Sequence, residues 1–337
     1  MKDRKLASIQ KIREIKEIEG KDRIVQSLAL GWSMVTQKSN GFQPGDFCVL
    51  FEIDSILPDE EWCAFLGENK RIKTKKFGGV LAQGLILPLD TVPIGDLLQT
   101  IPEEDWDGLD LTVYLGVKQW EPPLDTNSGD SKGAFPSYII SKTDEIRIQS
   151  EPSLLYDLID TPWYASLKCD GSSATYLWGD TNEFWACSRN MRKSETSHFY
   201  EVGLKYGLDK ELADQRHLVF QGEIVGPGIQ GNKMGRPDKE FYVFNIYDRD
   251  GRFYYGIDDM KEICDELNLP LVPILYRSIG RYSISEFVEM AKGNYPDTKT
   301  PREGIVVRPD VPMYSPILGG PLSFKVINPD YLLKYES

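Results

Sequence analysis

A stretch at residues 121–136, EPPLDTNSGDSKGAFP, most constrains how this chain folds. It is rich in Pro, Gly, Ser and Asp and nearly free of apolar side chains, which is the composition of a linker between domains. The chain has 337 residues, enough for about two domains of roughly 150 residues each. We therefore expect a first domain over residues 1–120, a linker over 121–136 and a second domain over 137–337.

The charge of the chain limits how it can bind nucleic acid. Asp and Glu outnumber Lys and Arg by 52 to 39, so the formal net charge is −13. A chain this acidic does not coat nucleic acid through bulk attraction, but a local basic surface can still grip a phosphate backbone. Trp32 and one basic cluster are the candidates for such a surface. The cluster consists of Lys70, Arg71, Lys73, Lys75 and Lys76. A charge run of this kind also occurs simply as a solvated hairpin, and both interpretations stay open.

Cysteine and histidine are too sparse for several kinds of site. The five cysteines lie far apart and form no C-x-x-C pair, which argues against a disulfide framework and a thiolate zinc site. The two histidines, His198 and His217, exclude a multi-histidine metal centre. No apolar run approaches the roughly 18 residues that a membrane helix needs. The chain start lacks the apolar region of a secretory signal. We expect an intracellular protein of the cytoplasm, with the nucleus as the alternative, no membrane partner, and a monomer.

The two parts of the chain differ in their apolar pattern. Residues 6–120 hold short apolar runs between turn residues, which indicates a small sandwich or barrel. After residue 137 strands mix with helices, which favours an α+β fold over a doubly wound sheet. The expected strands are 163–168, 183–188, 218–225, 241–247, 304–308 and 322–327. The expected helices are 152–160, 258–268 with Asp258 as N-cap, and 283–292 with Ser283 as N-cap.

The most informative local signal is KCDGSS, which begins at Lys168 and follows an apolar strand. A lysine at a strand end, partly removed from water, can have a lowered pKa and act as an amine nucleophile. Asp170 could orient this lysine or reach a metal ion, and Gly171 permits a tight turn close to phosphate oxygens. Taken alone, the pattern also fits an exposed hairpin turn.

Further polar residues recur at the ends or in the middle of later apolar strands. Arg189 and Asn190 follow one strand, and the forked guanidinium suits phosphate or ribose. Glu223 lies inside an apolar strand, where a carboxylate is costly unless paired or bound to metal. Phe244 offers a ring on which a base could stack, while Glu303 and Lys325 repeat the pattern of charge beside apolar strands. Together these residue types fit the transfer of a nucleotide onto a lysine.

In this order and spacing, the segments resemble the six motifs of the covalent nucleotidyltransferase superfamily, which contains polynucleotide ligases and mRNA capping enzymes. KCDGSS resembles motif I, CSRN motif Ia, FQGEIVG motif III, FYVFNIYD motif IIIa, EGIVVRP motif IV and SFKVIN motif V. The match runs from about residue 142 to 335.

Within the superfamily the chain is most similar to ATP-dependent RNA ligases of RNA ligase family five. The supporting blocks are RKLASIQKI, GDFCVLFEIDSILP, KRIKTKKFGGVLAQGLILPL and KTDEIRIQ. This resemblance implies an α+β chain with an N-terminal OB-fold β-barrel. A nucleotidyltransferase (adenylylation) domain of antiparallel sheets flanked by helices would follow.

The resemblance also implies a three-step reaction. Lys168 would attack the α-phosphate of ATP to give lysyl-AMP and pyrophosphate. AMP would then pass to an RNA 5′-phosphate, and a 3′-OH would displace it. Nicks in RNA-containing duplexes are the expected substrate.

The roles of the other site residues come from the same motif match. Phe244 would stack on adenine, and Arg189 and Glu223 would contact ribose or the RNA 3′ end, with Asn190 beside them. Lys325 would neutralise the α-phosphate. Asp170, Glu223 and Glu303 would hold Mg²⁺ or Mn²⁺, largely through its waters. Arg147 and Gln149 are further nucleotide contacts implied by the resemblance.

One position departs from the family pattern. Many relatives carry K-x-K in motif V, whereas Ile327 occupies the second lysine position here. Two other functions remain as alternatives. The chain could be a DNA ligase or a GTP-using capping enzyme, although the N-terminal OB domain argues against both. It could also be an inactive nucleic-acid-binding relative, against which the intact Lys168, Glu223, Glu303 and Lys325 argue.

Overall fold

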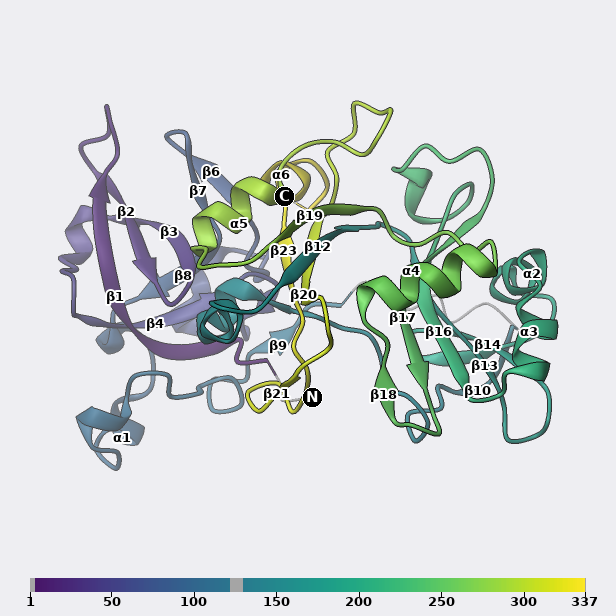
Figure 1. The fold of residues 1–337 in the computed structure, drawn as a ribbon. Helices are drawn as coiled ribbons and strands as arrows, with labels where there is room; N and C mark the ends of the chain where they lie inside the picture. The colour runs from purple at the N-terminus through teal and green to yellow at the C-terminus, as the bar shows by residue number, and fades with distance from the viewer. Residues whose placement is uncertain (1–3, 122–129, 337) are drawn as a thin grey trace. The chain divides into compact units, whose positions relative to one another are not determined.

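The computed structural model describes residues 4–121 and 130–336, and its chain forms two compact units. The first comprises Met1–Leu124, Ile146–Leu154 and Pro329–Ser337, and the second comprises Asp125–Glu145 and Leu155–Asn328. The fold class is α+β, as predicted (Figure 1). Of the linker expected at 121–136, residues 122–129 lie outside the described residues, and Ser131–Ala134 form strand β10 of the second unit.

The first unit is a five-stranded barrel of the OB type. Its strands lie in the order β3-β2-β1-β4-β8. The long strand β1 pairs with β4 through its first half and with β2 through its second, and the register shifts between Ile12 and Glu14. The Gln83 N–H donates to the Ser33 carbonyl oxygen at 2.7 Å and closes the ring beside β3. The strands are β1 (Ala7–Glu17), β2 (Ile24–Ala29), β3 (Trp32–Gln37), β4 (Phe47–Glu52) and β8 (Gly84–Leu87).

Smaller elements complete the first unit. They are the pairs β5 (Ser55–Ile56) with β9 (Lys118–Gln119) and β6 (Lys75–Phe77) with β7 (Val80–Ala82), strand β11 (Ile146–Arg147), and helices α1 (Gly95–Leu98) and α6 (Pro329–Tyr335). Trp32 is only 1% exposed and belongs to the barrel core. The expectation that it faces nucleic acid is therefore wrong, because alternation along β3 turns Trp32, Met34 and Thr36 inward together.

The second unit contains a seven-stranded sheet (Figure 1), and apolar side chains pack on both of its faces. Tyr176 and Leu177 are neighbours in the chain and both fully buried, one toward each face. The strand order is β10 (Ser131–Ala134), β15 (Met191–Lys193), β14 (Phe184–Ser188), β13 (Ser172–Trp178), β16 (Leu218–Val225), β17 (Glu240–Asp248) and β18 (Phe253–Tyr254). Helices α2 (His198–Lys205), α3 (Leu208–Asp214) and α4 (Ile257–Glu266) pack on one face.

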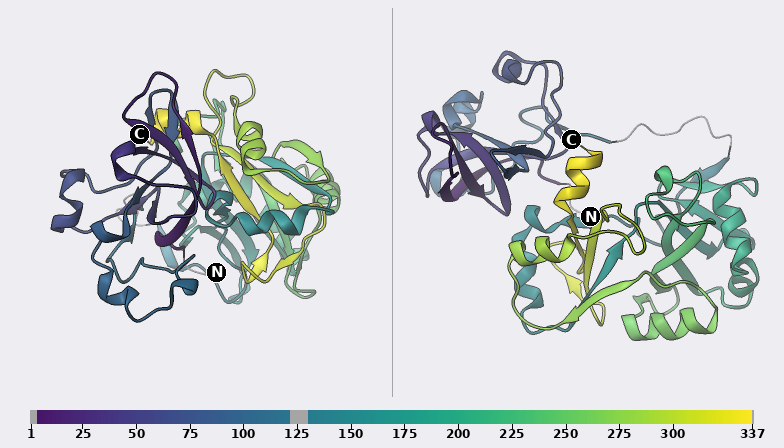
Figure 2. Two further views of the ribbon diagram at one scale, coloured as in Figure 1. Left: turned by 90° about the vertical axis from the view of Figure 1, so that its left-hand side faces the viewer. Right: turned by 90° about the horizontal axis from the view of Figure 1, so that it is seen from above.

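A smaller sheet in the same unit carries Lys168 and Lys325, and Glu303 directly precedes one of its strands. Figure 2 shows the chain from two further directions. Strands β23 (Phe324–Ile327), β20 (Gly304–Pro309), β12 (Trp163–Lys168) and β19 (Ile274–Ser278) lie side by side in that order. Helix α5 (Ile284–Ala291) packs on β20 and β23. The two-stranded pair β21 (Tyr314–Ser315) and β22 (Gly320–Pro321) lies between β20 and β23 in the chain.

Most of the elements expected after residue 137 form close to their predicted bounds. The capping box at Ser283 and Glu286 begins α5 as expected. Helix α4 begins at Ile257, one residue before the predicted range. Its N-cap is Gly256 and not Asp258, which lies in the first turn. The expected helix at 152–160 is a 3₁₀ helix over Pro152–Leu158.

Candidate active site

Lys168 ends β12, and its ammonium pairs with Glu303. The Lys168 Nζ lies 2.8 Å from Glu303 Oε1, and both side chains are less than a quarter exposed. The neighbouring strand brings them together, because Lys168 lies opposite Gly304, the first residue of β20. Gly304 has φ +153°, and a Cβ there would lie 2.1 Å from the Val326 carbonyl oxygen. Only glycine fits this close approach, so the sequence EG is required beside the lysine.

Glu223 reaches the same place from the large sheet. It lies on β16 opposite Ser173 of β13, directly after the turn that follows Lys168. A Cβ on Gly171 would lie 2.2 Å from the Ile224 carbonyl oxygen. The glycine of KCDGSS therefore lets the nucleophile turn lie against the strand that carries Glu223.

The carboxylates around Lys168 determine the direction in which its pKa shifts. Burial alone would lower the pKa of Lys168, but the charges of Glu303 and Glu223 outweigh it and raise this pKa above its usual value. The strand end permits a lowered pKa, whereas these paired carboxylates raise the pKa of Lys168. The pKa of Glu223 is raised to about 8, mainly by burial. The charge of Lys168 lowers this pKa, while the negative charges of Glu303 and Asp170 raise it.

This shift predicts how Glu223→Gln changes stability. The pKa of Glu223 is 4.5 in the reference state and about 8 in the folded chain. The folded chain therefore binds more protons between these values, and its stability falls as the pH rises through that window. Glutamine imitates the neutral carboxyl, so the variant lacks this loss and is the more stable protein near about pH 9. Thermal unfolding in chelator-containing buffer at several pH values checks this, and equal pH slopes for both proteins would contradict it.

Asp144 is a site residue that the sequence analysis did not single out. Its Oδ1 accepts from Lys325 Nζ at 3.1 Å and its Oδ2 accepts from Arg189 Nη2 at 2.7 Å. Burial would raise the pKa of Asp144, but Lys325 and Arg189 hold it below its usual value. One carboxylate thus joins the cations of motifs Ia and V.

All four side chains of the segment KTDE, residues 142–145, contact a motif residue. Lys142 Nζ donates to Asn190 Oδ1 at 2.9 Å, and the Thr143 and Ser173 hydroxyls lie 3.0 Å apart. Glu145 pairs with Arg308, whose guanidinium carbon lies 5.6 Å from the Phe244 ring centroid. The segment therefore ties together motifs I, Ia, IV and V and borders the ring predicted to stack on adenine.

The predicted metal ligands are not gathered into one group. Asp170 pairs with Lys233, and Glu303 with Lys168. Over the described ranges, no three His, Cys, Asp or Glu side chains come close enough together to hold a metal ion. Mg²⁺ usually takes one or two carboxylates and keeps several waters. Glu223 and Glu303, which act on the same ammonium, fit that kind of site.

Other predicted contacts belong to the first unit. Arg147 donates to Asp54 Oδ2 at 3.1 Å, and Gln149 is 4% exposed. In the basic cluster, Lys70 donates to the Cys63 carbonyl oxygen, and Arg71 pairs with Asp54 at 2.6 Å and stacks on Trp120. Lys73 is half-buried, while Lys75 and Lys76 are exposed on β6. The exposed β6–β7 hairpin is thus the part of the cluster open to a partner, and the nucleic-acid role of the cluster stays a prediction.

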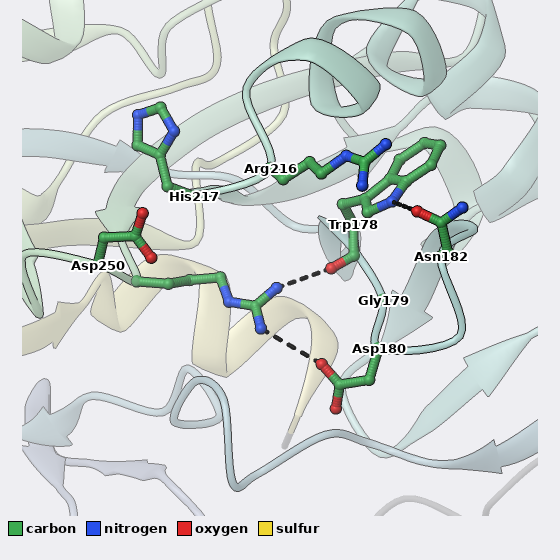
Figure 3. Close-up of a pocket in the computed structure, with 8 residues that line it drawn as sticks. Trp178, Gly179, Asp180, Asn182, Arg216, His217 and Asp250 are labelled. Carbon is green, nitrogen blue, oxygen red and sulfur yellow. Dashed lines mark hydrogen bonds and ion pairs between the residues drawn. The ribbon is translucent and has the colours of Figure 1, made fainter.

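A shallow pocket of about 330 Å³ lies away from these residues (Figure 3). It is lined by Trp178, the last residue of β13, by the turn between β13 and β14, and by residues just before β16 and just after β17. Arg249 donates there to the Trp178 carbonyl oxygen at 2.8 Å, and Arg216 lies over the Trp178 ring. These cations fasten the turns, and none of the predicted site residues lines the pocket.

Comparisons with known proteins identify the family of the chain. A family model described as RNA ligase matches residues 161–327, and a model of an OB-fold domain matches residues 6–89. The structure of Naegleria gruberi RNA ligase with PPi is 31% identical, with a TM-score of 0.84 over 99% of both chains. A mutant of that ligase with AMP and Mn is 31% identical, with a TM-score of 0.86 over 99% of both chains.

A third structure, of a mutant of the same ligase with ATP and Mn, is 32% identical with a TM-score of 0.83, over 99% of this chain and 98% of that one. A curated protein, calcium-dependent protein kinase 11 of Oryza sativa subsp. japonica, is 30% identical over 89 residues, 24% of this chain. The match spans only 16% of the kinase, and nothing about function rests on it. The likeness to the Naegleria ligase runs through both units, and the chain belongs to the RNA ligase family.

Proposed function

We propose that this RNA ligase seals 3′-OH/5′-phosphate nicks in RNA-containing duplexes through a lysyl-AMP on Lys168. The ligase uses ATP and a divalent metal ion. The structures of Naegleria ligase mutants with ATP and Mn and with AMP and Mn support this. The observation that carries the proposal is the Lys168 amine between Glu303 and Glu223, at the end of an apolar strand.

In the first step, Lys168 Nζ attacks the α-phosphorus of ATP. A nitrogen–phosphorus bond forms while the bond from phosphorus to the pyrophosphate oxygen breaks. The ammonium must first lose a proton, and Glu303 Oε1, at 2.8 Å, is placed to accept it. A bound divalent ion supplies positive charge that neutralises phosphate oxygens.

The other groups bind and orient the nucleotide. Lys325 lies opposite Val306 and Lys168 opposite Gly304, two residues away on β20, so both lysines are on one face of the small sheet. Lys325 and Arg189 supply the cations for phosphate and ribose, and the Phe244 ring supplies a face for adenine. In the second step AMP passes to a 5′-phosphate end, and in the third a 3′-OH displaces it to form the phosphodiester.

Further proposals concern the setting of the enzyme. We assign the nucleic-acid-binding domain to residues 1–120 and the adenylylation domain to residues 137–337, and expect a monomer that acts in the cytoplasm. All five cysteines are buried and free, which suits a reducing compartment. No helix in residues 4–121 and 130–336 is long and apolar enough to cross a membrane.

A substrate series tests the proposed function. A nicked RNA duplex, the same strands unannealed, and a nick with a deoxyribose 3′ end are each incubated with ATP or GTP. Sealing of the nicked RNA duplex with ATP, faster than that of the single strands, is expected. Preference for GTP would favour a capping enzyme, and preference for the deoxyribose 3′ end would favour a DNA ligase. If lysyl-AMP formed but no substrate were sealed, the protein would carry out adenylylation and the proposed ligase function would be wrong.

The exposed lysines of β6 lead to a prediction about RNA. Lys75 and Lys76 are exposed beside Phe77, which is 44% exposed. The double variant Lys75→Glu, Lys76→Glu should raise the half-saturating concentration of nicked RNA about tenfold or more at moderate salt, since two phosphate contacts turn repulsive. Lysyl-AMP formation from ATP should stay unchanged. Lys70→Gln, at a lysine turned toward Cys63, is the matched control, and an unchanged RNA requirement in the double variant would remove this hairpin from the binding surface.

A further inference from the structure

Tyr295 is a buried residue beside Lys168, the proposed nucleophile. It lies in the loop between α5 and β20, and its side chain is 1% exposed. Its ring packs in one apolar cluster with Leu167 and Cys169, the two chain neighbours of Lys168. The tyrosine is therefore fixed directly behind the reactive amine.

The hydroxyl of Tyr295 connects the backbones of the two paired residues. The Glu303 N–H donates to Tyr295 Oη at 3.1 Å, and the Tyr295 hydroxyl donates to the Lys168 carbonyl oxygen at 3.4 Å. Lys168 and Gly304 are the last paired residues of β12 and β20 at this end. The hydroxyl thus stands just beyond the ladder, where it links two backbone groups that no longer pair with each other.

This link accompanies a change of direction at Glu303. Gly304 has φ +153°, and β20 begins at this glycine. The Glu303 carboxylate then meets the Lys168 ammonium at 2.8 Å. Lys168, in the last pair of the ladder, and Glu303, just before β20, therefore present their side chains to each other.

The loop that carries Tyr295 is held independently of Lys168. The buried Arg302 guanidinium donates to the carbonyl oxygens of Ala291 and Met290 at the C-terminal end of α5. The Asn328 amide side chain donates to the Arg302 carbonyl oxygen at 2.9 Å. The Asn328 backbone N–H donates to the Glu303 carbonyl oxygen. A cation at the end of a helix satisfies carbonyl groups that lack intrahelical partners. These contacts hold the end of the loop at residues 302 and 303, and the Asn328 amide also donates to the Gly293 carbonyl oxygen, two residues before Tyr295, at 3.2 Å.

We propose that Tyr295 is a positioning residue for lysine adenylylation: its hydroxyl holds the backbones of Lys168 and Glu303 at the spacing that aligns amine and carboxylate for attack. The inference rests on the proposed roles of Lys168 and Glu303. Tyr295 itself forms no bond to the nucleotide and transfers no proton. Its effect is orientation, and displacement of reacting groups by about 1 Å can cost about 100-fold in rate.

Tyr295→Phe tests the proposal because it removes only the hydroxyl. Tyr176→Phe is the matched control, since Tyr176 is fully buried in the same unit and its hydroxyl also donates to a backbone carbonyl, that of Phe199, at 2.8 Å. Single-turnover formation of lysyl-AMP is measured over a range of ATP concentrations with Mg²⁺. Tyr295→Phe should lower the maximal rate about tenfold or more and leave the half-saturating ATP concentration within about twofold. Tyr176→Phe should leave both unchanged.

A second measurement does not depend on activity. Exchange of the Glu303 amide hydrogen should become faster in Tyr295→Phe than in the wild type, because that amide loses its acceptor, whereas Tyr176→Phe should not change it. The two variants should lose similar amounts of thermal stability, since each loses one buried hydroxyl. A maximal rate equal to that of Tyr176→Phe, or a loss seen equally in ATP binding, would overturn the proposal. Wild type that forms no lysyl-AMP, even after pyrophosphate treatment, would instead refute the proposed function on which it rests.

Discussion

Lys168→Ala should form no covalent AMP adduct under conditions in which the wild type is fully labelled. The protein is mixed with Mg²⁺ and ATP labelled at the α-phosphate and then separated on a denaturing gel. Label survives only if it is bonded to the protein, and the amine proposed to form that bond is Lys168 Nζ. Alanine has no nucleophilic group, so the loss should be complete.

Two further variants separate the loss of the nucleophile from the loss of its charge. Lys168→Arg keeps a cation beside Glu303 but supplies no amine nucleophile, so it should also stay unlabelled. Lys205→Ala removes a surface lysine whose ammonium donates to the Lys239 carbonyl oxygen, and it should label as the wild type does. Label on Lys168→Ala would disprove the assignment. Wild type that takes no label is treated with pyrophosphate first, because an enzyme purified as lysyl-AMP would then release ATP.

The strands of the second unit were predictable because their apolar runs have clear ends. Trp163–Lys168 and Leu218–Val225 form the strands predicted for them. Helix starts were less certain, since an acid in the first turn and an acid at the N-cap both stabilise the same helix end. The sequence alone therefore favours Asp258 as the N-cap, whereas the N-cap in the structure is Gly256.

The motif positions of the site were visible in the sequence, but the contacts between them were not. Lys168, Glu223, Glu303 and Lys325 belong to separate strands, and each motif marks its own residue. Asp144 lies in the block KTDEIRIQ, but its partners Lys325 and Arg189 are distant in the chain, so the block does not show what it contacts. Tyr295 lies outside every motif, and only the fold places its hydroxyl beside the Lys168 and Glu303 backbones. The raised pKa of Lys168 has the same origin: the strand end suggests desolvation, and only the fold shows the carboxylates that outweigh it.

Lys325→Ala should lower the maximal rate of lysyl-AMP formation by about 100-fold or more, as removal of one preorganised charge contact at a developing anion does. Lys325 shares a face of the small sheet with Lys168, and Asp144 holds its ammonium at 3.1 Å. Ile327, at the second lysine position of motif V, is 4% exposed and brings no charge. No second lysine on β23 can therefore replace Lys325.

The control and a partner variant show whether charge or structure is responsible. Lys261→Ala, on the exposed side of α4, removes a lysine outside the site and should keep the full rate. Asp144→Asn keeps Lys325 but weakens the ion pair that holds the Lys325 ammonium. The rate of lysyl-AMP formation should therefore fall less in Asp144→Asn than in Lys325→Ala. If Lys325→Ala matched the Lys261 control, neutralisation of the α-phosphate would have to come from a cation outside motif V. Lys233, which pairs with Asp170 beside the nucleophile, would then be the residue to replace next.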